Sequence, residues 1–250
     1  MSRALVLGEM LVIASLAAAT AGCNTIKSKE LEADLGKRVA DMGLQATSVS
    51  CPSGVEATPR QVFTCQIAIA APAEARKQAK TYALDVTIQA VANGKASFDT
   101  AWHDGPAVQT AKMEGLLATE LGKALGGAVT LACGDEPLRF LDSQHKLRCE
   151  LAAGEVKTKA TIDFDARTLS PTDWHLDPPL LAKAKLEAVL APAVREKAPG
   201  VTIDCGAAPF LARPADGVVT CKASDGAQTG ALKVDIDDNL NVKRWELAPG

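Results

Sequence analysis

Seven cysteines are the side chains of this sequence that could most readily do chemistry. A cysteine thiolate can ligate zinc, exchange disulfides or act as a nucleophile. However, the sequence contains no C-x-x-C pair, which is the usual spacing in zinc sites and thiol oxidoreductases. It also offers only three histidines as further metal ligands. The cysteines therefore predict neither a metal site nor a redox centre, and we expect no cofactor.

Six of the cysteines form three pairs, each separated by a loop that contains proline and glycine. The second cysteine of a pair lies in an alternating apolar pattern, such as Phe63, Cys65 and Ile67, that is typical of a half-buried strand. Six cysteines allow many pairings, but only one pairing gives each copy of the pattern its own cross-link. The predicted disulfides are Cys51–Cys65, Cys133–Cys149 and Cys205–Cys221.

Two further patterns could carry chemistry: Trp102-His103 with its counterpart Trp174-His175, and the acidic stretch 235–239, DIDDN. On a strand whose tryptophan faces the core, the following histidine faces solvent. The acidic stretch alternates with apolar residues before a turn, and it lacks the glycine of an EF-hand loop. We therefore expect core tryptophans and outward polar positions. No G-x-S-x-G, H-E-x-x-H or P-loop motif is present, so we assign no catalytic residue.

Residues 1–22 have the organisation of an export signal peptide. Arg3 provides a positive charge, and residues 10–19, MLVIASLAAA, form an apolar run too short to span a bilayer, which takes about 20 residues. The sequence TAGC that follows resembles a bacterial lipobox except at Thr20, where leucine is usual. In a lipobox the cysteine is acylated and becomes the first residue of the mature chain, so Cys23 is the predicted lipidation site.

The odd number of cysteines supports lipidation. Cys23 has no counterpart in the three pairs, and an unpaired cysteine in an exported protein needs an explanation. Ordinary secretory cleavage after Ala19-Thr20-Ala21 is the alternative, and it leaves Cys23 as a free thiol. With several acyl chains such as palmitate attached, we expect a membrane-anchored lipoprotein that faces the periplasm or the cell exterior.

The composition argues against a nucleic-acid partner. Aromatic residues make up only 4% of the chain, which leaves few side chains on which bases or sugars could stack. The formal net charge is −3, and no cluster of Lys and Arg marks a phosphate-binding face.

A repeated pattern fills the chain beyond Cys23. Trp102, Trp174 and Trp245 are spaced by 72 and 71 residues, and Cys149 and Cys221 by 72. Each copy begins with apolar residues at helical spacing and continues with a strand that ends in the first cysteine. A loop, a strand with the second cysteine and two closing strands complete the copy.

These copies predict the domain organisation. After the signal peptide at 1–22, we place modules at 23–105, 106–177 and 178–250. We expect an α+β fold of three tandem modules, each with one helix followed by a four-stranded antiparallel sheet and one internal disulfide. A domain this small is marginally stable alone, and a disulfide is a common remedy in exported proteins.

The stretch 48–65, SVSCPSGVEATPRQVFTC, resembles a bacterial family of exported and lipid-anchored domains of unknown function, number four-three-three-three. The resemblance rests on Cys51-Pro52 and on the F-x-C sequence that ends at Cys65. The second and third copies depart from it, because Gly134 and Gly206 follow their first cysteines. The resemblance covers nearly all of the chain beyond the signal peptide. It implies a disulfide-bearing envelope domain with no assigned catalytic residue.

Together these features predict a lipid-anchored cell-envelope protein of a non-catalytic binding or structural type, and not an enzyme. Its partners would be the membrane, through the N-terminal lipid, and an envelope protein or a cell-wall component. Two alternatives stay open. One is a secreted proteinaceous inhibitor of hydrolases, by analogy of architecture alone. The other is an envelope enzyme whose site is assembled from residues distant in the sequence.

Overall fold

The computed structural model describes residues 16–17, 25–70, 79–92 and 95–248. The chain divides into two compact units. The first comprises Met1–Met113, Gly134–Leu147 and Asp163–Asp173, and the second comprises Glu114–Cys133, Arg148–Ile162 and Trp174–Gly250. Cys23 and the remainder of the predicted signal peptide, apart from Leu16 and Ala17, lie outside the described residues.

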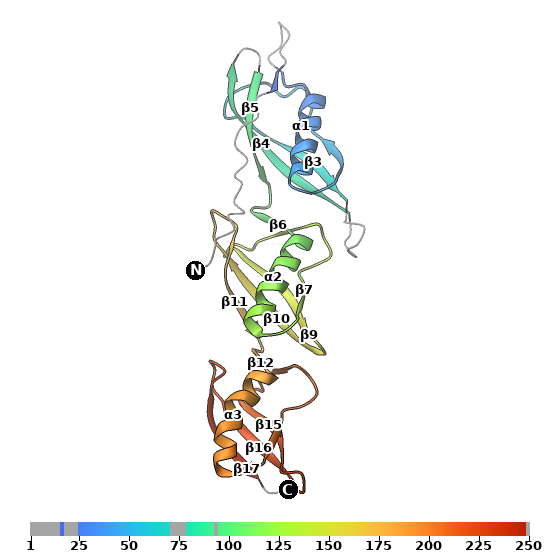
Figure 1. The fold of residues 1–250 in the computed structure, drawn as a ribbon. Helices are drawn as coiled ribbons and strands as arrows, with labels where there is room; N and C mark the ends of the chain where they lie inside the picture. Colours follow the sequence, from blue (N-terminus) through green and yellow to red (C-terminus); the bar gives the residue numbers. More distant parts are fainter. Residues whose placement is uncertain (1–15, 18–24, 71–78, 93–94, 249–250) are drawn as a thin grey trace. The chain divides into compact units, whose positions relative to one another are not determined.

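The first sheet has the strand order β1-β5-β4-β3-β2, and every neighbouring pair is antiparallel. Its strands are β1 (Leu16–Ala17), β2 (Ala46–Ser50), β3 (Val62–Ile69), β4 (Lys80–Ala92) and β5 (Lys95–Trp102). Helix α1 (Ser28–Asp41) covers one face of this sheet (Figure 1). Leu31, Leu35 and Val39 recur at helical spacing and are buried against the strands.

The second sheet has the order β11-β10-β9-β7. Its strands are β7 (Thr130–Ala132), β9 (Lys146–Ala153), β10 (Val156–Phe164) and β11 (Pro171–Asp177). Helix α2 (Thr110–Leu125) buries Leu117 and Leu121, four residues apart on one face of the helix.

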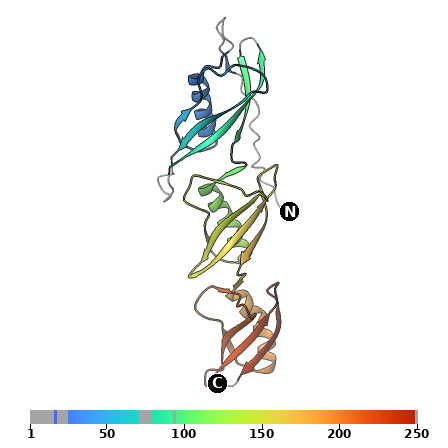
Figure 2. The ribbon, with the colours of Figure 1, turned by 180° about the vertical axis from the view of Figure 1, so that it is seen from behind.

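The third sheet has the order β13-β15-β16-β17. Its strands are β13 (Thr202–Asp204), β15 (Val218–Ser224), β16 (Thr229–Ile236) and β17 (Val242–Ala248). Helix α3 (Lys183–Lys197) packs Leu186, Leu190 and Val194 into the core of this sheet, and Pro192 lies inside the helix without ending it. Seen from behind, the strands lie in front of the helices, so each helix covers one face of its sheet (Figure 2).

The expected fold of three modules, each one helix followed by a four-stranded sheet, is wrong. The described residues form five sheets, and the first sheet has five strands. Two extra sheets have two strands each. One pairs β6 (Ala107–Gln109) with β8 (Leu138–Phe140), and the other pairs β12 (Leu180–Ala182) with β14 (Phe210–Ala212).

The reason for this error lies in the length of the missed strands. The four strands of the two extra sheets have three residues each, which is too short to show the period-two alternation that identifies a strand in sequence. The additional strand of the first sheet, β1, has two residues and lies in the segment predicted to be a signal peptide. β6 and β12 directly precede α2 and α3, while β8 and β14 lie in segments between paired cysteines that were expected to be loops. Which of these distant segments pair with each other is decided only by the tertiary structure.

The expectation of core tryptophans holds only in part. Trp102 is partly buried, and its ring meets the edge of Tyr82 at a centroid distance of 6.0 Å. Trp245 is partly buried in the third core, with the Lys197 ammonium 4.8 Å from its ring centroid. Trp174 is 38% exposed, because β11 ends the second sheet and buries little besides Leu176.

The three predicted disulfides are present. They are Cys51–Cys65, Cys133–Cys149 and Cys205–Cys221, with Cα–Cα distances of 4.3, 4.1 and 4.1 Å. Within each pair the second cysteine lies in the strand next to the edge strand that the first cysteine follows. Each disulfide therefore closes the short connection between two neighbouring strands and ties the edge strand to its sheet.

Replacing Cys205 and Cys221 together by serine should destabilise the third sheet. Their sequence separation is 16 residues, and closing a loop of that length stabilises a fold by about 3 kcal/mol in the chain-entropy model. For a domain of this size that corresponds to a fall in melting temperature on the order of 10 °C. Thermal unfolding followed by circular dichroism measures the change. Thr220→Ser, at the exposed position beside Cys221, is the control, and an unchanged melting temperature in the double variant would contradict a structural role.

Candidate functional site

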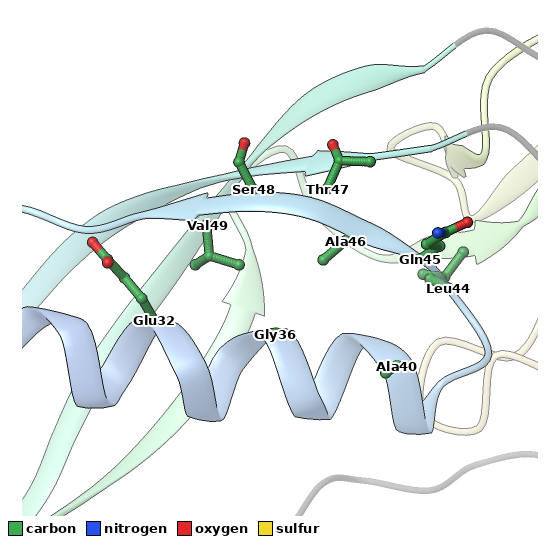
Figure 3. A pocket seen from close by; sticks show the side chains of 9 residues that line it. All are labelled: Glu32, Gly36, Ala40, Leu44, Gln45, Ala46, Thr47, Ser48 and Val49. Atoms are coloured by element: carbon green, nitrogen blue, oxygen red, sulfur yellow. The ribbon is translucent and has the colours of Figure 1, made fainter.

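A groove runs between α1 and the edge strand β2 (Figure 3). Its volume is about 450 Å³, and it is open to solvent along its length. The residues that line it are Glu32, Gly36, Ala40, Leu44, Gln45, Ala46, Thr47, Ser48 and Val49. The groove exists because the helix presents small residues, Gly36 and Ala40, toward the strand. A Cβ atom added at Gly36 would meet the Val49 side chain at 3.8 Å.

The side chains of β2 divide the groove into an apolar floor and a polar rim. Val49 and Ala46 point toward the helix, whereas Ser48 and Thr47 point away from it (Figure 3). The Thr47 hydroxyl donates a hydrogen bond to the carbonyl of Ala68, at 3.2 Å. The surface left along the helix suits an apolar side chain or an extended segment of polypeptide, and Glu32 is its one charged group.

The Glu32 carboxylate is occupied by the fold. Its Oε1 accepts a hydrogen bond from the backbone N–H of Cys51 at 2.9 Å. The same contact occurs twice more along the chain, from the N–H of Cys133 to Glu114 at 2.6 Å and from the N–H of Cys205 to Glu187 at 2.8 Å. In each case a helix glutamate holds the first cysteine of a disulfide. This makes Glu32 a structural group and argues against its use as an acid or base.

Sequence reasoning missed these glutamates, although a signal was present. Each lies 18 or 19 residues before its cysteine, and each directly follows an apolar residue: Leu31, Met113 or Leu186. A comparison of the three cysteine pairs by their preceding helices would have found a glutamate at the same place in every copy. What the spacing does not show is that the side chain reaches a backbone N–H at the end of a strand.

A second groove lies at the corresponding place between α2 and the segment that leads into β7. Its volume is about 540 Å³. Small residues stand four and eight positions after the helix glutamate in both grooves: Gly36 and Ala40 in α1, Ala118 and Gly122 in α2. In α3 those positions are Ala191 and Arg195, so a long charged side chain replaces a small one.

A third cavity, of about 460 Å³, lies within the second unit. Phe210 and Pro209 line one part of it, and Gly127 and Gly154 line another. A Cβ atom at Gly127 would come within 2.7 Å of the Phe210 ring, so the close approach of that ring requires glycine. The shape of this cavity therefore depends on the contact between the Phe210 ring and Gly127, which has no side chain.

Lys183 also lines this cavity, and its amine is fully engaged by the fold. Its Nζ lies 2.7 Å from a carboxylate oxygen of Asp204 and 3.6 Å from one of Glu187, and it also donates to the Gly206 carbonyl. The hydrogen bond to Asp204 raises the pKa of Lys183, and the same contact lowers the pKa of Asp204. An ammonium held charged in this way is not a nucleophile.

His103 lies on the outer face of the first sheet, as expected, and pairs with a carboxylate. Its Nδ1 is 2.9 Å from Oδ2 of Asp85, and the Thr64 hydroxyl donates to Oδ1 of the same carboxylate at 2.7 Å. In a serine- or threonine-type catalytic arrangement the hydroxyl would donate to the histidine. Here it donates to the aspartate, so the three residues form an ion pair with a supporting hydrogen bond.

The acidic stretch 235–239 forms a strand end and a turn. Asp235 pairs with Arg244 at 2.7 Å, and Asp238 with Arg213 at 3.0 Å. Oδ1 of Asp237 accepts the backbone N–H groups of Asn239 and Asn241, and hydrogen bonding to Asn241 is the main cause of its lowered pKa. Within the described ranges, no three His, Cys, Asp or Glu side chains gather where they could hold a metal ion.

The predicted site residues fall into two groups. The six cysteines of the disulfides lie in three separate places, one beside each helix, and do not form a common site. Cys23 lies outside the described residues. None of the helices in the part of the chain that the structure describes is both long and apolar enough to cross a membrane.

Comparisons with models of protein families, with curated proteins and with solved structures returned no match. The resemblance to the family of exported domains therefore stays a prediction.

The helix glutamate of the third sheet should contribute measurably to stability. Glu187→Ala leaves the buried N–H of Cys205 without its acceptor, and we expect a loss of about 1–2 kcal/mol of unfolding free energy. Glu187→Gln retains an acceptor oxygen and should cost less than half as much. Chemical denaturation measures both values, with Glu196→Ala on the exposed face of the same helix as control. Equal losses for the alanine and glutamine variants would rule out the hydrogen bond as the cause.

The ion pair of His103 predicts a specific dependence on pH. Its hydrogen bond with Asp85 raises the pKa of His103 above its usual value, and the Thr64 hydrogen bond is the main cause of the lowered pKa of Asp85. The stabilisation is therefore complete below the pKa of an unfolded histidine, about 6.5. It is lost as the pH rises through the higher folded-state pKa.

Replacing His103 by Gln should accordingly lower the melting temperature more at a pH well below 6.5 than at a pH well above it. In an Asp85→Asn background the same replacement should show no such difference, because the partner carboxylate is absent. Differential scanning calorimetry across this range makes the comparison. A loss that is independent of pH would show that the pair does not couple protonation to folding.

Proposed function

We propose that this chain is an exported lipoprotein of the bacterial cell envelope, anchored through Cys23 and acting by binding or spacing without catalysis. The observation that carries the proposal is the complete pairing of the other six cysteines. Because each of them is bonded to another, none is left to pair with Cys23 within the chain. The sequence around Cys23, with its apolar run and its Ala-Gly-Cys ending, offers acylation as the use of that thiol.

The three disulfides support export. Disulfides of this structural kind form and persist in oxidising compartments and are rare where thiols are kept reduced. Repeated cross-linking beside each helix fits a chain built from similar disulfide-stapled segments. We place the protein on the outer side of a cytoplasmic membrane, facing the periplasm or the cell exterior.

The chemistry of the cavities favours binding over turnover. The described charged groups that line these cavities are engaged by backbone groups or ion pairs of the fold: Glu32, Lys123, Lys183 and Glu187. The grooves beside α1 and α2 are open to solvent, and Val49 and Ala46 form the apolar floor of the groove beside α1. Such surfaces suit contact with a polypeptide or a cell-wall polymer better than enclosure of a small reactant.

Lipidation is tested by intact mass and fractionation after expression in a bacterium that processes lipoproteins. The wild-type protein should begin at Cys23, carry the mass of its acyl chains and partition into the membrane fraction. Cys23→Ser should be soluble and lack the acyl mass. Asn24→Ser, a change of the neighbouring residue, should behave as wild type.

Two results would count against the proposal. If wild type and Cys23→Ser are both soluble and neither carries acyl mass, the chain is not a lipoprotein. A wild-type product that begins at Gly22 would instead indicate ordinary secretory cleavage after Ala21.

A further inference from the structure

The outer edge of β5 pairs with a second segment of the chain. In strand β1, Leu16 lies opposite Ala96 and Ala17 opposite Lys95, in antiparallel register. An edge strand presents a row of backbone N–H and C=O groups that is a template for another strand. The pairing shows that the edge of β5 is accessible and that an extended segment fits beside it.

The proposed maturation removes this cover. Leu16 and Ala17 lie within residues 1–22, which leave the protein if the chain is cleaved before Cys23. The mature chain would then retain β5 as the outermost strand of its first sheet. The present inference rests on that proposed processing, because without it β1 stays in place.

Strand β5 has eight residues and no bulge, whereas the edge strands β7 and β13, which are also regular, have only three residues each. In the first sheet the pairing of β2 with β3 skips Thr47, and in the third sheet the pairing of β17 with β16 skips Lys243. The extra residue therefore lies in the edge strand itself, and such bulges protect edges from pairing. Between β4 and β5 the skipped residue is Gln89, which lies in β4. β5 is regular along its whole length.

Packing holds β5 in place for pairing. Phe98 is buried in the core of the first sheet, and the guanidinium of Arg38 lies 5.3 Å from the centre of its ring. Ala96 packs against the same core. Ser97, which lies between Ala96 and Phe98, and Lys95 and Asp99, two positions to either side of Ser97, therefore face the opposite side of the sheet.

We infer that the mature chain pairs with a second copy of itself through the freed edge of β5, in antiparallel register about Ser97. In that register Lys95 of each copy lies opposite Asp99 of the other, and Ala96 lies opposite Phe98. The two copies form two identical pairs of opposite charge on one face and two apolar pairs on the other. A two-fold axis through the sheet relates them, as in most homodimers.

The charge pattern is what selects a second copy as the occupant. Opposite charges directly across an antiparallel pair stabilise it, and like charges destabilise it. Lys95 and Asp99 are both exposed and stand at equal distances from Ser97 along the strand, so self-pairing places each opposite a residue of opposite charge. Asp99 also accepts a hydrogen bond from Gln89 on β4 through Oδ2, which leaves Oδ1 for Lys95. The interface is isologous and closes on itself, which limits assembly to a dimer.

The association state of residues 24–250 tests the inference. Among the described residues, the core cluster of the first sheet begins at Ile26, and residues 24–250 include all of that described cluster. We expect a monomer–dimer equilibrium at micromolar concentration by sedimentation equilibrium. The uncleaved chain, refolded with its disulfides, should sediment as a monomer because β1 occupies Lys95 and Ala96, which the proposed register needs. A monomeric 24–250, or an uncleaved chain that dimerises equally well, overturns the inference.

Charge reversal then locates the interface. Lys95→Asp puts like charges opposite each other in two symmetric places, and we expect the dissociation constant of the dimer to rise about tenfold or more. Combining Lys95→Asp with Asp99→Lys should restore dimerisation. Lys243→Asp on β17 is the matched control and should leave it unchanged. If Lys95→Asp has no effect, or the double variant does not recover, β5 is not the interface.

Two controls exclude misfolding and acylation as causes of a change in dimerisation. The melting temperature of each variant verifies that the fold is intact before its association is compared. The chain 24–250 carries no Cys23, so its dimerisation is measured independently of acylation. A failure of lipidation would therefore appear in the mass and fractionation experiment, and a failure of the β5 interface in the sedimentation experiment.

Discussion

The bond from a helix glutamate to the first cysteine of each disulfide organises this protein. Glu32, Glu114 and Glu187 each accept a hydrogen bond from the N–H of the cysteine that directly follows an edge strand. The disulfide then ties that cysteine to the neighbouring strand. A helix, the edge strand and the next strand are thereby joined at one place. The carboxylate satisfies a backbone donor that the edge strand would otherwise leave without a protein partner.

This hydrogen bond limits the chemistry available on the surfaces beside the helices. Glu32 is hydrogen-bonded to the backbone, and it is the one carboxylate among the described residues that line the grooves beside α1 and α2. Small residues along each helix define these grooves. Lys183 and His103 have raised pKa values because each is paired with a carboxylate of the fold. These hydrogen bonds and ion pairs stabilise the fold, and the surfaces beside the helices are left for contacts with other molecules.

The edges of the sheets limit where this protein could pair with another strand. Two of the described edges are bulged, and β5 is regular but covered by two residues of the predicted signal peptide. Processing of the N-terminus would thus change the surface of the folded protein as well as its location. Membrane anchoring and pairing through β5 would both follow from one cleavage, since the cut that exposes Cys23 also removes β1.

The sequence alone determined the features that depend on local periodicity and on counting. Apolar residues at helical spacing predicted the three helices, alternation around Cys65, Cys149 and Cys221 predicted the central strands, and recurrence selected the disulfide pairs. The short strands, the exposure of Trp174 and the glutamate contacts were decided by the tertiary structure. Each of these features depends on which distant segment of the chain lies beside it. A three-residue strand or a single side chain has no periodic pattern from which that neighbour could be predicted.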